Sequence, residues 1–179
     1  MKKKSFLFAL LLFVTLTMNS QNTENKSLKI GAGLGFSHSD NCTGSGTLYS
    51  IGYQQNIWKD RLRFNPNLSL GFYKPNFLIG ALDQYFNSIN LNANLNFDLI
   101  RFRRLSLLVY AGGEAGISQG YVSTIGSVND FHLGVDFGGG IRIDSKSRKT
   151  ALNVLPFNFR FGYPNFIESY LKLEFDVKL

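Results

Sequence analysis

The segment from Ile89 to Leu99 alternates strictly between apolar and polar residues. Its odd-numbered positions hold Ile, Leu, Ala, Leu, Phe and Leu, and its even-numbered positions hold four Asn and one Asp. Only a β-strand places successive side chains on opposite faces, so the segment is predicted to be a strand with one apolar and one polar face. Its eleven residues, at about 3.3 Å each and tilted by about 40°, span roughly 27 Å, close to the hydrocarbon thickness of a membrane.

Seven further segments repeat this alternation, so eight strands are predicted. They are residues 28–37, 47–58, 62–73, 89–99, 105–118, 130–144, 150–162 and 169–179. Pro66 lies in the middle of the third strand, where it weakens the hydrogen-bond ladder and predicts a bulge. The predicted loops are 38–46, 74–84, 119–129 and 163–168, and the predicted turns are 59–61, 101–104 and 145–149. No segment has the pattern of a crossover helix, so the predicted fold is an antiparallel up-and-down barrel, which leaves no exposed strand edge.

The composition of the polar face distinguishes a soluble barrel from a membrane barrel. A soluble lipocalin-like binding barrel would turn its apolar face inward, whereas a membrane barrel would turn it outward. Three strands have a polar face that is largely glycine: Gly31, Gly33, Gly35, Gly112, Gly116, Gly134, Gly138 and Gly140. Soluble proteins cover their surface with Lys and Glu instead, and a narrow lumen needs small residues beside large ones. The sequence therefore predicts an all-β, eight-stranded antiparallel transmembrane β-barrel with its polar face inside.

Large polar residues of both charge signs occupy the inward face of the predicted strands. The candidates for ion pairs in the lumen are Arg63, Glu114, Asp136, Arg142, Arg160, Lys172 and Glu174. A carboxylate at mid-strand depth needs a basic partner, and for Glu114 we expect Arg142, Arg160 or Lys172. An ion pair that fills the lumen is favoured over a gate or a proton path, because eight strands leave little open bore.

The first twenty residues have the layout of a secretory signal peptide. Three lysines precede an apolar run from Phe6 to Leu16, and small and polar residues follow up to Ser20. A single membrane anchor is the competing interpretation, but the apolar run is short for a span. Residues 21–27 are then a polar linker, and residues 28–179 form the barrel as one domain. Without the three signal lysines the formal net charge falls from +7 to +4, which does not favour nucleic-acid binding.

The signal peptide, the eight amphipathic strands and the chain end inside the last strand resemble small outer-membrane β-barrels of Gram-negative bacteria, of the OmpX and OmpA transmembrane-domain type. The likeness is one of pattern and covers Leu28 to Leu179. It implies a location in the outer membrane, contact with its lipids and insertion by the outer-membrane assembly machinery. It also implies a structural, surface-interaction or envelope-assembly role without enzymatic activity. Members often end in an aromatic residue, whereas this chain ends in Leu179, with Phe175 four residues earlier.

Acid–base catalysis would depend on His38 or His132, the two histidines of the chain. Some eight-stranded outer-membrane barrels modify lipid A with a His and a Ser on one face. Ser39 follows His38 directly, so alternation places the two on opposite faces, and neither histidine has a Ser two residues later. No catalytic residue is assigned, and a lipid-A-modifying enzyme is the alternative function. The single cysteine, Cys42, excludes an intramolecular disulfide and a cysteine-based metal cluster, and no cofactor or metal is predicted.

Aromatic residues lie near the outward-loop end of every predicted strand. They are Phe36, Tyr49, Phe72, Tyr85, Tyr121, Phe131, Phe161 and Tyr170. Such rings suit the headgroup boundary, so they are predicted to form a membrane-interface belt about 25 Å from a looser second set. The second set is Trp58, Phe64, Phe97, Phe102, Phe157 and Phe175. An exported chain starts in the periplasm, so the three short turns, which are rich in Lys and Arg, are predicted to be periplasmic. They are either ordinary solvated turns or contacts to the anionic headgroups of the inner leaflet.

Overall fold

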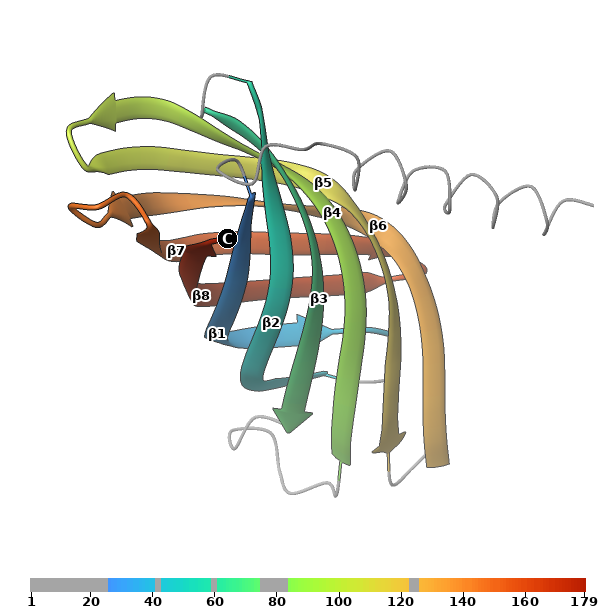
Figure 1. The fold of residues 1–179 in the computed structure, drawn as a ribbon. Helices are drawn as coiled ribbons and strands as arrows, with labels where there is room; N and C mark the ends of the chain where they lie inside the picture. The colour runs from blue at the N-terminus through green and yellow to red at the C-terminus, as the bar shows by residue number, and fades with distance from the viewer. Residues whose placement is uncertain (1–25, 41–42, 59–60, 75–83, 123–125) are drawn as a thin grey trace, which may run out of the picture.

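The computed structural model describes residues 26–40, 43–58, 61–74, 84–122 and 126–179. Its eight strands form one closed barrel, in which each strand pairs antiparallel with its neighbours in the chain and β1 pairs with β8 (Figure 1). The strands are β1 (Lys26–His38), β2 (Thr43–Trp58), β3 (Leu62–Lys74), β4 (Gln84–Phe102), β5 (Leu105–Val122), β6 (Gly126–Asp144), β7 (Thr150–Tyr163) and β8 (Phe166–Lys178). The predicted eight-stranded up-and-down barrel is confirmed.

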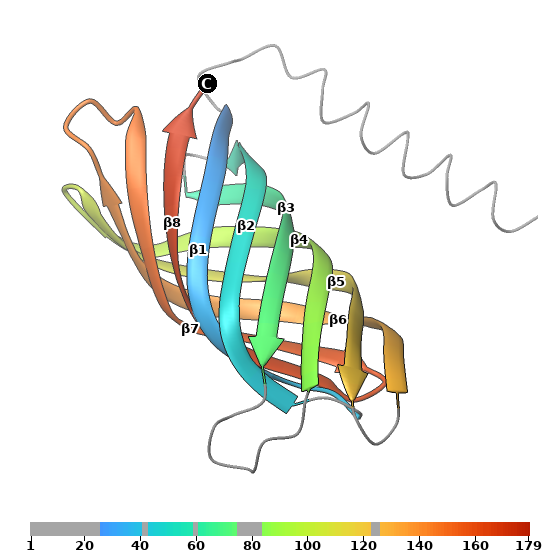
Figure 2. The same cartoon turned by 90° about the horizontal axis from the view of Figure 1, so that it is seen from below.

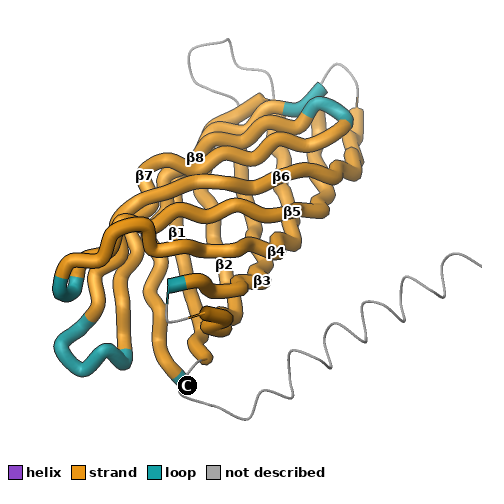
Figure 3. Tube along the Cα trace, turned by 90° about the horizontal axis from the view of Figure 1, so that it is seen from above, coloured by secondary structure: helices purple, strands orange, loops and turns teal. Residues whose placement is uncertain are grey.

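Strand direction divides the connections between the two ends of the barrel. The turns after β2, β4 and β6 lie at the same end as the C-terminus, which we call the terminal end (Figure 2). The C-terminal ends of β1, β3, β5 and β7 lie at the opposite end, which we call the loop end. Figure 3 follows the long, tilted strands between the two ends. In the described part of the chain, no helix has both the length and the apolar character needed to cross a membrane.

Several strands extend beyond the predicted bounds. The β5–β6 ladder continues through Gln119 and Asn129, which pair with each other, so most of the predicted loop 119–129 is strand. The β8 strand begins at Phe166 rather than Ser169, and β1 includes Lys26 and Ser27 of the predicted linker. Backbone hydrogen bonds continue a ladder where the alternation has ended, so the pattern underestimates strand length. The predicted signal peptide and the rest of the linker lie outside the described residues.

The predicted bulge at Pro66 is wrong. Pro66 pairs with Ala93 in an unbroken β3–β4 register, and the β2–β3 register is the same on both sides of it. An irregularity lies instead between Leu155 and Asn158 of β7, a stretch that contains Pro156. There the alternation shifts: the Leu155 side chain points inward and is 1% exposed, whereas Phe157 is 68% exposed. Register shifts of this kind re-aim side chains, so Leu155 fills the lumen instead of facing outward.

The apolar and polar faces of the barrel are arranged as a membrane requires. Along β4, Ile89, Leu91 and Leu95 are exposed on the outside, whereas the asparagines between them are buried inside. The same division holds along β8, where Leu171 and Leu173 face out and Lys172 faces in. A soluble lipocalin-like barrel has the reverse arrangement, so that alternative is excluded. The chain forms a transmembrane β-barrel with an apolar outer wall and a polar interior.

Candidate functional site in the barrel interior

The structure places all seven predicted lumen residues in the interior. They come from five strands, and none is more than 6% exposed: Arg63 of β3, Glu114 of β5, Asp136 and Arg142 of β6, Arg160 of β7, and Lys172 and Glu174 of β8. Buried charges are stable only when they are paired, so their partners decide what the interior can do.

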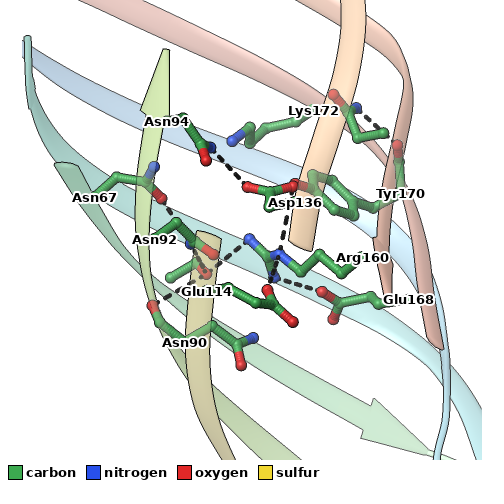
Figure 4. Close-up of polar contacts among 12 residues, drawn as sticks. Asn67, Asn90, Asn92, Asn94, Glu114, Asp136, Arg160, Glu168, Tyr170 and Lys172 are labelled. Carbon is green, nitrogen blue, oxygen red and sulfur yellow. Dashed lines mark hydrogen bonds and ion pairs between the residues drawn. The ribbon is translucent and has the colours of Figure 1, made fainter. Parts of the chain in front are cut away.

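Arg160 is the centre of the ion-pair cluster nearest the loop end (Figure 4). Its Nε lies 3.2 Å from Oε2 of Glu114 and 3.8 Å from Oδ1 of Asp136. Its Nη1 donates a hydrogen bond to Glu168, which also accepts one from the hydroxyl of Tyr73. Of the three partners expected for Glu114, Arg160 is therefore the one in contact, and three carboxylates surround one guanidinium group.

A second cluster lies further toward the terminal end and joins β1 to β8. The Nζ of Lys29 is 2.6 Å from Oε2 of Glu174, and the Nζ of Lys172 is 2.9 Å from Oε1 of the same carboxylate. The ring of Tyr170 lies between this cluster and the first one, with the Arg160 guanidinium carbon 4.7 Å and the Lys172 ammonium 5.5 Å from its centroid. The ring thus contacts cations of both clusters.

A third cluster closes the terminal end of the lumen. Arg63 donates hydrogen bonds to both carboxylate oxygens of Asp98. Arg142 lies between two carboxylates, with Nη1 2.6 Å from Oδ2 of Asp176 and Nε 2.9 Å from Oδ1 of Asp144. Arginine's planar fork suits such paired contacts, which fix the side chains as well as neutralise them.

The asparagines of β4 connect these clusters along the length of the lumen. The side-chain amide of Asn92 donates to Asn67 at 3.0 Å, and that of Asn94 donates to Asp136 at 2.7 Å (Figure 4). Asn96 donates to Gln54 at 3.3 Å. The alternation of β4 therefore has two consequences: its apolar face meets lipid, and its polar face supplies a ladder of amides that donate to buried acceptors on β2, β3 and β6.

Apolar side chains pack inside the lumen at two levels. Tyr73, Phe86 and Val128 form one cluster toward the loop end, where the first two rings are stacked 4.9 Å apart. Leu108, Tyr110 and Leu155 form the other. A cavity beside the second cluster has a volume of about 10 Å³, which leaves room for about one water molecule at most. Side chains thus fill the part of the lumen that these residues line.

Sequence reasoning missed Glu168, Lys29, Asp98 and Asp176 as lumen ion-pair residues. Glu168 fell in a predicted loop, although its spacing from Tyr170 and Lys172 puts all three on one face of a strand. The other three stood on the polar faces of predicted strands, and only their partners across the barrel distinguish them from solvated residues. The alternation contained a signal for each of the four positions, but none for the pairing.

Seven of the eight predicted belt aromatics have exposed side chains on the outer wall: Phe36, Tyr49, Phe72, Tyr85, Tyr121, Phe131 and Phe161. The prediction for Tyr170 is wrong, because its side chain is 4% exposed and lies inside. Its hydroxyl donates to Oδ1 of Asp136 at 2.8 Å and lies 3.0 Å from the hydroxyl of Tyr110. Leu171 faces outward, so its neighbour must face inward. The position of the belt at a membrane boundary stays a prediction.

The two histidines lie on opposite faces of the wall. His132 is buried in the lumen, where its Nε2 is 2.9 Å from Oδ1 of Asn90 and its ring stacks on Phe166 at 3.8 Å. His38 is exposed, and its Nδ1 is 2.6 Å from the hydroxyl of Thr43. The two therefore do not share a site. Within the described ranges, no three residues of the His, Cys, Asp and Glu types are grouped so that they could hold a metal ion.

No protein-family model and no curated protein sequence matches the chain. Among solved structures, Neisserial surface protein A is similar at 17% identity and a TM-score of 0.59, over 86% of this chain and 97% of that one. Ail, the attachment invasion locus protein of Yersinia pestis, is similar at 11% identity and a TM-score of 0.55, over 86% and 99%. A major outer membrane protein from Thermus thermophilus is similar at 10% identity and a TM-score of 0.58, over 86% and 99%.

These likenesses concern the fold. The chain has the architecture of small eight-stranded outer-membrane β-barrels, as its sequence pattern predicted. The predicted location in the outer membrane follows from this architecture together with the apolar outer wall.

Proposed function

We propose that the chain is a non-enzymatic outer-membrane barrel with a filled lumen and a structural, surface-interaction or envelope-assembly role. The observation that carries the proposal is the interior, where ion pairs, an amide ladder and two apolar clusters occupy the lumen. A surface role accords with the names of two proteins of similar fold, a Neisserial surface protein and an attachment invasion locus protein. Outer-membrane lipids and the assembly machinery are the proposed partners.

The filled lumen argues against passage of solutes. A solute that crosses from end to end must displace the stacked rings of Tyr73 and Phe86 and separate the three carboxylates from Arg160. Separating a buried ion pair leaves uncompensated charge in a region of low dielectric, which makes opening rare. We therefore assign contacts with partners to the outer surface of the barrel, and the side chains in the lumen stabilise the barrel.

Conductance in a planar lipid bilayer tests this proposal. We expect the purified chain to insert without steady currents of porin size. A variant with Tyr73→Ala and Phe86→Ala, which removes the ring pair near the loop end, serves as a sensitised control and should give more frequent brief openings. Steady porin-sized currents from the unmodified chain would refute the filled-lumen account.

A lipid-A assay addresses the alternative function. We expect no modification of radiolabelled lipid A by the purified chain or by its His132→Ala variant. The His132 imidazole is enclosed in the lumen, where it contacts the Asn90 amide and the Phe166 ring and lies 3.8 Å from Oε1 of Glu114. Modification that depends on His132 would replace the proposed function with the enzymatic one.

A further inference from the structure

At the terminal end of the barrel, a cavity of about 60 Å³ opens between the strand ends. Residues of β1, β2, β3, β4, β6 and β8 line it together with two of the turns, so it exists only because the barrel closes. We call it the terminal cup. Its volume corresponds to several water molecules, which leaves room for one small charged group.

The floor of the cup is electrically balanced. Arg63 is paired with Asp98, and Arg142 is paired with Asp176 and Asp144. Arg101 also pairs with Asp98, at 2.9 Å. The floor thus contains three arginines and three carboxylates, and their ion pairs hold the side chains in place.

The rim of the cup is not balanced. Lys26, Arg103, Arg148 and Lys178 line it, and none of these four side chains takes part in the ion pairs of the described residues. Barrel closure brings them together: the backbone N–H of Leu179 donates to the carbonyl of Lys26 at 3.0 Å. The N–H of Lys178 donates to the carbonyl of Lys149, one residue beyond Arg148, at 2.8 Å. Four cations therefore surround an opening whose floor is neutral.

We propose that the terminal cup binds a phosphate group. Arginine forks and lysine ammonium groups around a concave opening are the donors that bind phosphate in proteins, and low local dielectric strengthens such contacts. The floor residues Ser27, Gln54 and Arg142 are inward-facing, so the cup opens toward the aqueous phase rather than sideways toward lipid tails. The phosphate group comes from a soluble ligand or from a lipid headgroup that reaches over the rim.

Calorimetric titration of the full chain in zwitterionic detergent with inorganic phosphate and pyrophosphate tests the site, with chloride at matched ionic strength as the reference. The cup variant is Arg148→Gln with Lys178→Gln, both at exposed rim positions. The control variant is Arg104→Gln with Lys146→Gln, which are exposed at the same end, carry the same charge and do not line the cup. We expect the cup variant to weaken pyrophosphate binding about tenfold or more, and the control variant to weaken it less than about twofold.

If both variants weaken pyrophosphate binding equally, the effect is one of general surface charge and the proposal is overturned. Phosphate or pyrophosphate binding no stronger than that of chloride would also overturn it. Vesicles with and without phosphatidylglycerol distinguish the two sources of phosphate. Loss of binding to phosphatidylglycerol vesicles and to free phosphate in the cup variant supports the site with a headgroup source, and loss for free phosphate alone supports it with a soluble source. Binding to vesicles that the cup variant leaves unchanged, without binding of free phosphate, would refute it.

Discussion

Replacing Arg160 by glutamine tests whether the interior ion pairs stabilise the barrel. The Arg160 side chain is fully buried and is the cation that Glu114, Asp136 and Glu168 share. The Arg160→Gln variant keeps a hydrogen-bond donor near the position of the arginine Nε but removes the charge and the Nη donors. Three carboxylates then face one another in a region of low dielectric.

The expected loss follows from the cost of leaving a buried charge unpaired. Removing one partner of a buried pair costs about 3–5 kcal/mol. Glutamine still donates to one carboxylate, so we expect a decrease in the free energy of unfolding near the lower end, about 3 kcal/mol. With a urea m-value of about 1–3 kcal/mol/M, the unfolding midpoint should fall by roughly 1–3 M.

Urea unfolding in lipid vesicles, followed by circular dichroism, measures this change. Arg103→Gln is the matched control, because Arg103 is exposed in the turn after β4, and it should change stability by less than about 0.5 kcal/mol. The Glu114→Gln variant alone should cost about 1–3 kcal/mol. Combined with Arg160→Gln, it should show a coupling energy of about 0.5 kcal/mol or more. An Arg160→Gln loss no larger than that of Arg103→Gln, or strictly additive effects, would refute the reasoning.

Three further predictions concern packing, hydrogen bonding and orientation. A Cβ at Gly134 would lie 2.0 Å from a backbone oxygen of β7, so Gly134→Ala should lower stability by about 1–3 kcal/mol, whereas Gly113→Ala, with its nearest atom at 4.0 Å, should be neutral in the same urea assay. Tyr170→Phe removes a donor to a buried carboxylate and should cost about 1–3 kcal/mol, but Tyr163→Phe, at an 83% exposed position, should not. Cys42 lies outside the described residues, between β1 and β2. If this connection faces the cell exterior, an impermeant maleimide should label Cys42 on intact cells. Labelling only after lysis would show that the barrel has the opposite orientation.

The strands and their faces were predictable because a membrane barrel imposes two requirements on every position. A side chain on the outer wall must suit lipid, and one on the inner wall must suit a polar lumen, so the alternation of Ile89 to Leu99 has no exception. Where β5 and β6 continue past this alternation, the requirement is absent and the ladder alone maintains the strand. The pattern therefore predicts the part of each strand that carries the alternation and stops short of its end.

The pairing in the lumen was not predictable, because it depends on register between strands distant in the sequence. Glu114 pairs across β5 and β6 with Gly134, and Asp136 pairs across β6 and β7 with Arg160. These registers bring Arg160 rather than Arg142 or Lys172 to Glu114. A one-residue shift in the register of any strand pair changes which lumen side chains meet. The β7–β8 pair contains such a shift, between Leu155 and Asn158.

Charge is distributed unevenly along the barrel axis, and this distribution connects the filled lumen with the terminal cup. The cluster around Arg160 gathers three carboxyl groups on one guanidinium, whereas the cup rim has four cations above a balanced floor. The excess of cationic side chains at the rim makes the terminal end attractive to anions. An anion that approaches the terminal end is attracted to the rim, but any deeper movement brings it toward carboxylates and closed side-chain packing. The filled interior that opposes conduction therefore also stops a phosphate group at the terminal cup, where it binds without passing into the lumen.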